Sequence, residues 1–140
     1  MNLNKIFDNY KNIAVVGMSK SIEKAAHTVP GYMKKRGYNI VPVNPNSEII
    51  MKMKSYPNLL SVEEEIDMVN IFRPSYDCLE VVEQAIERKN KRGDIKLIWL
   101  QLGIINNDAK MMAEENGIEF IQDKCIYVEH KQYLKDKLDN

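Results

Sequence analysis

The sequence has little cysteine, no excess of either charge and no long hydrophobic run. Its two cysteines, Cys78 and Cys125, form no Cys-x-x-Cys pair and no Cys/His cluster, so neither a zinc site nor a disulfide framework is predicted. Lys and Arg total 20 and Asp and Glu total 20, which does not indicate a nucleic-acid-binding surface. No stretch approaches the roughly 20 apolar residues that a membrane span needs. We therefore expect no metal, no nucleic-acid partner and no membrane partner.

The N-terminal residues lack the apolar core and the cleavage site of a secretory signal, which predicts a cytoplasmic protein. The 140 residues match the size of one ordinary domain. A composition with 44% hydrophobic and 29% charged residues is typical of globular proteins. We expect a single domain over residues 1–140, with a core over about 12–130.

Short apolar runs alternate along the chain with amphipathic stretches of helical period, which predicts an α/β fold. Most of the runs are apolar on both faces, as in strands covered by helices on each side. We therefore predict a single Rossmann-like, doubly wound, mainly parallel five-stranded sheet with helices on both faces. The predicted strands cover 13–16, 39–43, 68–72, 97–102 and 119–121.

The predicted helices lie between these strands and at the two ends of the chain. They cover 3–10, 28–36, 75–89, 107–116 and 127–138. Ser75 is expected to cap the third of them, with Arg88 in its last turn near the negative end of the helix dipole. Ser61 with Glu64 resembles a capping box and predicts a further short helix. Pro42 is expected to mark the end of the second strand, because proline interrupts an inner strand.

The loops after the predicted strands are the expected ligand site, because ligands bind at the carboxyl ends of parallel strands where the strand order reverses. The loops that start at Gly17, Asn44, Arg73 and Gly103 should therefore converge. The first strand runs into Gly17-Met18-Ser19-Lys20 and then a helix, a context in which backbone N–H groups and the helix dipole hold phosphate. The alternative is that Gly17 only makes a tight turn.

Two features argue against an NAD site. The G-x-G-x-x-G fingerprint is incomplete, with Ser19 and Ile22 in place of its second and third glycines. NAD-binding units usually end the second strand with Asp or Glu, whereas this chain has Val43-Asn44-Pro45. An asparagine accommodates a ribose that carries a phosphate, which a carboxylate would repel. Lys20 and the basic run 34–36 are possible charge partners, although a solvated helix face also explains that run.

Five short motifs at the predicted strand ends carry a resemblance to a known family. They are IAVVGMS (13–19), GYNIVPVNP (37–45), FRP (72–74), WLQLG (99–103) and DKCI (123–126). In this order they resemble the stand-alone CoA-binding protein family, whose fold is similar to the CoA-binding domain of the succinyl-CoA synthetase alpha subunit. The resemblance covers roughly residues 12–130. It implies binding of coenzyme A, whose ribose carries a 3′-phosphate.

The resemblance also implies which residues contact the ligand. Gly17 and Ser19 would approach the diphosphate, and Asn44 would shape the adenosine end of the site. Arg73 would offer charge to a phosphate. The full set of predicted contacts is Gly17, Met18, Ser19, Lys20, Asn44, Pro45, Phe72, Arg73, Pro74, Gln101, Gly103 and Cys125. Relatives commonly show a small polar residue around 25–27, so the contacts of residues 21–28 are left open.

Cys125 and His130 raise the question of catalysis, with Asp123 as a third member. Residues this close along one segment seldom aim an imidazole at a thiol, so no catalytic residue is predicted. Cys125 is instead a candidate to form a mixed disulfide with the CoA thiol.

The predicted function is non-catalytic binding or sensing of coenzyme A or a CoA derivative, a small-molecule nucleotide ligand. Two alternatives remain open. One is a small NAD(P)-type Rossmann oxidoreductase or a CoA-thiol-handling enzyme. The other is a protein-interaction module that a nucleotide orders, whose protein partner the sequence does not identify.

Overall fold

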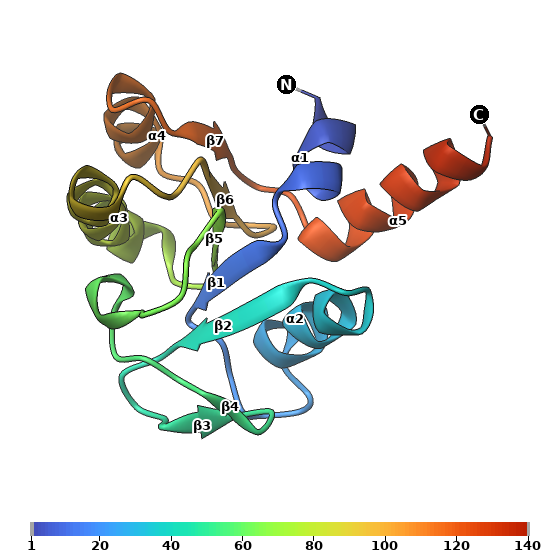
Figure 1. Cartoon of the computed structure of the whole chain (residues 1–140), viewed down its shortest axis with the longest axis horizontal. Coiled ribbons are helices and arrows are strands. Elements are labelled where there is room, and N and C mark those ends of the chain that lie inside the picture. Colours follow the sequence, from blue (N-terminus) through green and yellow to red (C-terminus); the bar gives the residue numbers. More distant parts are fainter. Residues whose placement is uncertain (1, 140) are drawn as a thin grey trace.

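The computed structural model describes residues 2–139 and is built on a five-stranded parallel sheet (Figure 1). The strands follow the order β2-β1-β5-β6-β7. Their bounds are β1 (Asn12–Val16), β2 (Asn39–Val43), β5 (Met68–Ile71), β6 (Leu97–Leu100) and β7 (Glu119–Ile121). Every pairing within this sheet is parallel. The predicted α/β Rossmann-like fold is confirmed.

Helices cover both faces of the sheet. They are α1 (Leu3–Asn9), α2 (Ala25–Lys35), α3 (Cys78–Arg92), α4 (Asn107–Glu115) and α5 (Ile126–Leu138). Figure 1 shows α3 and α4 on one side of the strands and α1, α2 and α5 on the other. The chain runs from β1 through α2 to β2, but from β5 through α3 to β6 in the opposite direction along the sheet. The strand order therefore reverses between β1 and β5, and ligands bind at such a point.

The two helical layers bury separate cores. One cluster unites α3 and α4 with residues such as Val69 and Ile98. The other unites α1, α2 and α5 around Trp99 and Phe7, whose rings lie 5.9 Å apart between centroids. Both cores draw on alternate residues of the same strands, which explains why the strands are apolar on both faces. No helix of residues 2–139 has the length and apolar character needed to cross a membrane.

Pro42 and Ser75 show where local sequence signals need refinement. Pro42 is the next-to-last residue of β2, and β2 lies at the edge of the sheet, where proline is tolerated. The predicted helix cap at Ser75 is wrong, because Ser75 begins a short 3-10 helix, η2 (Ser75–Asp77), that precedes α3. Its hydroxyl oxygen instead accepts a hydrogen bond from the Ile105 amide (3.0 Å) and ties two carboxyl-edge loops together.

The connection from β2 to β5 holds further structure that the sequence patterns did not predict. A small antiparallel hairpin joins β3 (Ile49–Ile50) to β4 (Met53–Lys54). The predicted helix after Ser61 is absent, because Ser61 ends the 3-10 helix η1 (Leu59–Ser61), which Asn58 caps. The segment that follows η1 is held instead by Arg88, which is fully buried and donates to the Val62 carbonyl oxygen (2.7 Å).

Candidate functional site

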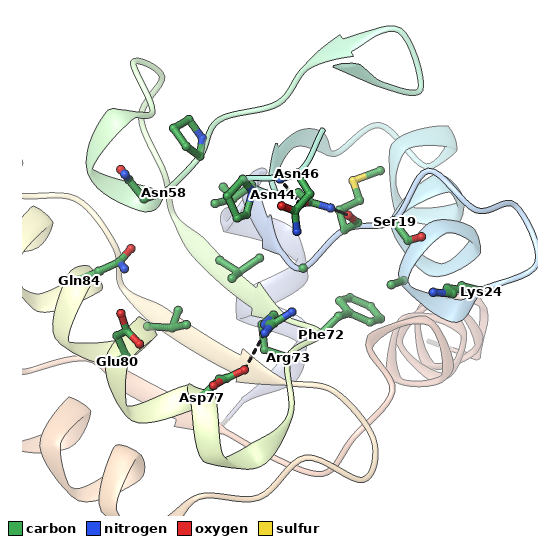
Figure 2. Close-up of a pocket in the computed structure, with 18 residues that line it drawn as sticks. Ser19, Lys24, Asn44, Asn46, Asn58, Phe72, Arg73, Asp77, Glu80 and Gln84 are labelled. Carbon is green, nitrogen blue, oxygen red and sulfur yellow. Dashed lines mark hydrogen bonds and ion pairs between the residues drawn. The ribbon is translucent and has the colours of Figure 1, made fainter. Parts of the chain in front are cut away.

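A cavity of about 570 Å³ opens at the carboxyl ends of β1, β2 and β5, at the reversal of strand order (Figure 2). Its size is that of a small-molecule site. Loops after the three strands, the start of α2, the start of α3 and the chain after β4 all contribute. The lining residues are Val16, Gly17, Met18, Ser19, Lys24, Ala26, Val43, Asn44, Pro45, Asn46, Pro57, Asn58, Phe72, Arg73, Asp77, Glu80, Val81 and Gln84.

Gly17 brings the first loop into close contact with the loop after β5. Its φ of +86° lies in the left-handed region, and a Cβ there would stand 2.7 Å from the Phe72 carbonyl oxygen and 3.0 Å from Arg73 Cδ. The Gly17 amide donates to the Val43 carbonyl oxygen (2.9 Å). Only glycine allows the three strand ends to meet this closely.

Asn44 joins the first and second loops. Its Nδ2 donates to the Met18 carbonyl oxygen (2.9 Å), and its Oδ1 accepts from the Asn46 amide (2.8 Å). The side-chain amide thus fixes the shape of the cavity wall. An aspartate here would have no N–H to donate to Met18, which is a structural reason for asparagine besides the predicted ligand contact.

The start of α2 forms one end of the cavity. Ser19 places the loop against this helix: its amide donates to the Ala26 carbonyl oxygen (3.1 Å), and its own carbonyl oxygen lies 2.7 Å from His27 Nδ1. Lys24 is the N-cap residue but makes no side-chain cap hydrogen bond. Lys24 and Ala26 line this end of the cavity, and no side chain caps the start of α2, an arrangement suited to an anion.

Arg73 and Asp77 form an ion pair across the loop after β5. Arg73 Nη2 lies 2.7 Å from Asp77 Oδ2, and the two side chains are 49% and 30% exposed. Exposure of this degree weakens the attraction between them, so the guanidinium is available to a ligand phosphate. Figure 2 shows this pair at the cavity wall opposite the Asn44 loop.

The opposite end of the cavity is walled by α3 and by the chain after β4. Glu80, Val81 and Gln84 line it from α3, and Asn58 lines it from the β4 side. Gln84 Oε1 accepts a hydrogen bond from the Leu59 amide (3.4 Å), which links the two walls. This end is rich in neutral polar groups and carboxylates, in contrast to the cationic end at α2.

Residues 11–131 match the model of a family described as a CoA binding domain. The chain belongs to this CoA-binding domain family. It is 35% identical over 128 residues to the uncharacterized protein YneT of Bacillus subtilis (strain 168), covering 91% of each chain. A solved structure described as a hypothetical protein from Pyrococcus horikoshii OT3 superposes with a TM-score of 0.88 at 34% identity, covering 94% of this chain and 89% of that one.

Larger enzymes contain a similar region. An ADP-forming acetate–CoA ligase II of Archaeoglobus fulgidus is 32% identical over 80 residues, which are 56% of this chain and only 12% of the ligase. The CoA-binding domain described here is thus similar to a small part of these ligases.

The cavity of this CoA-binding domain brings together part of the predicted contact set. Gly17, Met18, Ser19, Asn44, Pro45, Phe72 and Arg73 line it. The remaining predicted contacts, Lys20, Pro74, Gln101, Gly103 and Cys125, are not among its lining residues. Lys20 is exposed on the loop before α2, and Pro74 is the N-cap residue of η2.

Gln101, Gly103 and Cys125 belong to the neighbouring loops after β6 and β7. Gln101 is 5% exposed, and its Oε1 accepts from Asn70 Nδ2 (3.4 Å) and from the Ile126 amide (3.3 Å). The hydrogen-bond partners of the buried Gln101 side chain are thus groups of the protein itself. The Gly103 amide donates to Asp123 Oδ1 (2.7 Å), and Cys125 is the half-buried N-cap residue of α5.

Several lining residues of the CoA-binding domain were missed by sequence reasoning. Lys24, Asn58, Glu80 and Gln84 come from helices and from the chain after β4, whereas the strand-end rule points only to residues that follow strands. The one available signal was that Glu80 and Gln84 lie four positions apart on a predicted helix and therefore share a face.

The cysteines and His130 form no catalytic set. Cys78 is buried, and burial raises the pKa of its thiol to about 11, so it stays protonated at neutral pH. His130 is 2% exposed, and its Nδ1 lies 2.9 Å from the Tyr32 hydroxyl. No hydrogen bond within residues 2–139 joins it to Cys125. The same residues contain no group of three or more His, Cys, Asp or Glu side chains placed to hold a metal.

Proposed function

We propose that this chain binds coenzyme A, or a CoA derivative, in the cavity at the ends of β1, β2 and β5, and that it serves as a non-catalytic binding or sensing module. The observation that carries the proposal is the cationic end of this cavity. There, the uncapped start of α2, Lys24 and Arg73 face one space at the reversal of strand order.

The cationic end fits the diphosphate of coenzyme A. The Gly17 and Ser19 amides donate to protein carbonyl oxygens, so they set the loop rather than supply donors. The first N–H groups of α2 and the side chains of Lys24 and Arg73 would supply the donors. The ADP-forming acetate–CoA ligases with a similar region bear CoA in their names, which supports the same ligand class here.

A role in binding rather than catalysis is supported by what lines the cavity. Its polar side chains are amides, one hydroxyl, two cations and two carboxylates, and Asp77 already pairs with Arg73. Neither cysteine and neither histidine is among the lining residues. We propose that such a module binds CoA in the cytoplasm.

Cys125 adds a finer proposal about the thiol end of the ligand. It lies outside the cavity, but its side chain packs against the same apolar cluster as Phe72, which lines the cavity. A pantetheine arm that leaves the cavity over Phe72 would run toward it. With CoA disulfide as the oxidised partner, the Cys125 thiolate would attack one sulfur, form a mixed disulfide and release one CoA thiolate. Intact-protein mass spectrometry that shows no adduct, or an adduct retained in Cys125→Ser, overturns this proposal.

Isothermal titration of the purified protein tests the main proposal, with CoA, dephospho-CoA, acetyl-CoA, NAD and ATP as separate ligands. We expect CoA to bind and dephospho-CoA to bind more weakly, because it lacks the 3′-phosphate. A matching rise in melting temperature is expected, since a ligand of the native state alone stabilises it by mass action. NAD binding more tightly than CoA would favour the oxidoreductase alternative instead.

Two variants localise the binding. Lys24→Met and Arg73→Met should each weaken CoA binding by about tenfold, because each removes a charge-assisted contact to phosphate. Lys91→Met serves as the matched control, since Lys91 is exposed in the last turn of α3 and does not line the cavity. Equal affinity in all three variants and the wild type would place the site elsewhere.

A further inference from the structure

The cavity has a second end whose chemistry differs from that of the phosphate end. Figure 2 shows Ser19 and Lys24 on one side of the space, and Asn58, Glu80 and Gln84 on the other. The three side chains labelled on this second side are two amides and a carboxylate. An anionic group is disfavoured there, and a group with hydrogen-bond donors suits the Glu80 carboxylate.

Glu80 and Gln84 present complementary groups from one face of α3. They are four residues apart, so their side chains are neighbours one helical turn apart. The Glu80 carboxylate makes no hydrogen bond or ion pair within residues 2–139 and is free to accept. Gln84 uses its Oε1 to accept from the Leu59 amide, so its Nε2 group is the part left to donate.

Apolar side chains line the same cavity as this pair. Val81, which follows Glu80 on α3, is 9% exposed, and Val43 at the end of β2 is 3% exposed. Pro45 and Pro57 line the same cavity from the loops after β2 and β4. Two polar groups on one helix face, in a cavity that valine and proline side chains also line, suit a planar heterocycle with a hydrogen-bonding edge.

We propose that this end of the cavity binds adenine, and that Glu80 and Gln84 select it over 6-oxopurines. The inference rests on the proposed CoA function and identifies the residues that set its base specificity. Glu80 accepts from the 6-amino group of adenine, and Gln84 Nε2 donates to its N1 atom. The diphosphate then extends toward Lys24 at the start of α2.

Hypoxanthine inverts the hydrogen-bonding pattern of this edge. Its 6-oxo group is an acceptor and its N1 carries a proton, so a carboxylate would face an oxygen and an amide N–H would face another N–H. Such a mismatch leaves polar groups of both partners unpaired, which is how a hydrogen-bonding site rejects a close analogue.

Titration with CoA and with deamino-CoA, in which hypoxanthine replaces adenine, tests the inference. The wild type should bind CoA about tenfold more tightly than deamino-CoA, the lower range of discrimination for two hydrogen bonds to one base edge. The double variant Glu80→Gln/Gln84→Glu exchanges the acceptor and the donor and should reverse the preference, while Glu80→Ala should abolish it.

Glu83→Gln is the matched control, because Glu83 is exposed on the same helix and does not line the cavity. It should keep the wild-type preference. Equal binding of CoA and deamino-CoA by the wild type overturns the base-reading inference and leaves the CoA function standing. Absence of binding for CoA itself overturns the proposed function. A preference that Glu80→Ala retains would assign base selection to other residues and also overturn the inference.

Discussion

At the amino-terminal end of the sheet, Arg88 is 1% exposed, and its guanidinium is surrounded by acceptors. It contacts Asp94 (2.9 Å) and donates to the carbonyl oxygens of Leu59, Val62 and Glu64. At the carboxyl end, Glu80 is exposed and has no hydrogen-bond partner within residues 2–139. The same sheet therefore carries saturated polar groups at one end and available ones at the other.

This difference separates stability from binding. A buried charge is tolerated only when its hydrogen bonds are complete, so the Arg88 group holds the segment after η1 in one position. The 3-10 helix η1 joins that segment to Asn58, a residue of the cavity wall. The Arg88 group at the amino-terminal end thus helps to position the cavity wall at the carboxyl end. Substitutions at the amino-terminal end should mainly lower stability, and substitutions at the carboxyl end should mainly change ligand affinity.

Arg88→Met is expected to have the largest effect. It leaves the buried Asp94 carboxylate without its cation and removes the guanidinium donor from three carbonyl oxygens, and breaking a buried pair in this way costs about 3–5 kcal/mol. Urea unfolding should show this loss. Lys91→Met on the exposed face of α3 should change the free energy of unfolding by less than about 0.5 kcal/mol. A similar small loss for Arg88→Met would show that the network contributes little.

Gly17→Ala should reduce both the stability of the fold and the affinity for CoA. The new Cβ would stand 2.7 Å from the Phe72 carbonyl oxygen at a positive φ, which separates the loops after β1 and β5. We expect a stability loss of about 2–4 kcal/mol and CoA affinity reduced at least about tenfold. Gly117→Ala supplies the control, since its φ is +75° but nothing lies within 4 Å of an added Cβ. Equal losses in the two variants would mean that close approach is unimportant.

His130 is a second buried titratable group, and its surroundings favour the neutral imidazole over the charged one. Burial, with smaller contributions from the charges of Arg36 and Lys11, lowers its pKa from 6.5 to about 4. The unfolded chain takes up a proton near pH 6.5 and the native state does not, so stability is full above about pH 6.5 and falls toward pH 4.

Thermal and urea unfolding at pH 7 and pH 5 measure this effect. Of the stability lost by the wild type between them, about 2 kcal/mol is expected to come from His130. His130→Asn keeps a hydrogen-bonding side chain for Tyr32 and should lose that much less over the same interval. His27→Asn is the control. An unchanged pH dependence in His130→Asn would assign the acid sensitivity to other groups.

The strands and the loops that follow them are the features that the sequence patterns predicted well. The five main strands follow apolar runs and were predicted to within one or two residues at each end, because burial on two faces leaves a clear composition. Gly17, Asn44 and Arg73 followed from the rule that ligands bind after parallel strands. These predictions depend on residues that are close together in the sequence.

The features that were missed depend on how helices and loops are placed in space. Arg88 was predicted only in the last turn of its helix, whereas three of its acceptors lie on a distant segment of the chain. Lys24 precedes α2 and Glu80 belongs to α3, and these two helices cover opposite faces of the sheet. Both residues line the cavity. The β3–β4 hairpin turns through Met51 at φ 54° and Lys52 at φ 64°, without the glycine or asparagine that usually marks such a turn.

Asp77→Asn is the smallest expected change and tests whether the open end of the sheet is restrained by its own ion pair. In the free protein, Asp77 holds the Arg73 guanidinium at 2.7 Å, and a ligand phosphate must compete with it. Removing the carboxylate should raise CoA affinity about two- to fivefold and steepen its dependence on salt, because an exposed pair contributes little. Asp108→Asn in the first turn of α4 controls for the loss of a helix-terminal acid. If Asp77→Asn weakens CoA binding instead, Asp77 positions the Arg73 guanidinium for the ligand phosphate rather than competing for it. The pair would then be fixed in place before the ligand binds, as the Arg88 group is at the amino-terminal end.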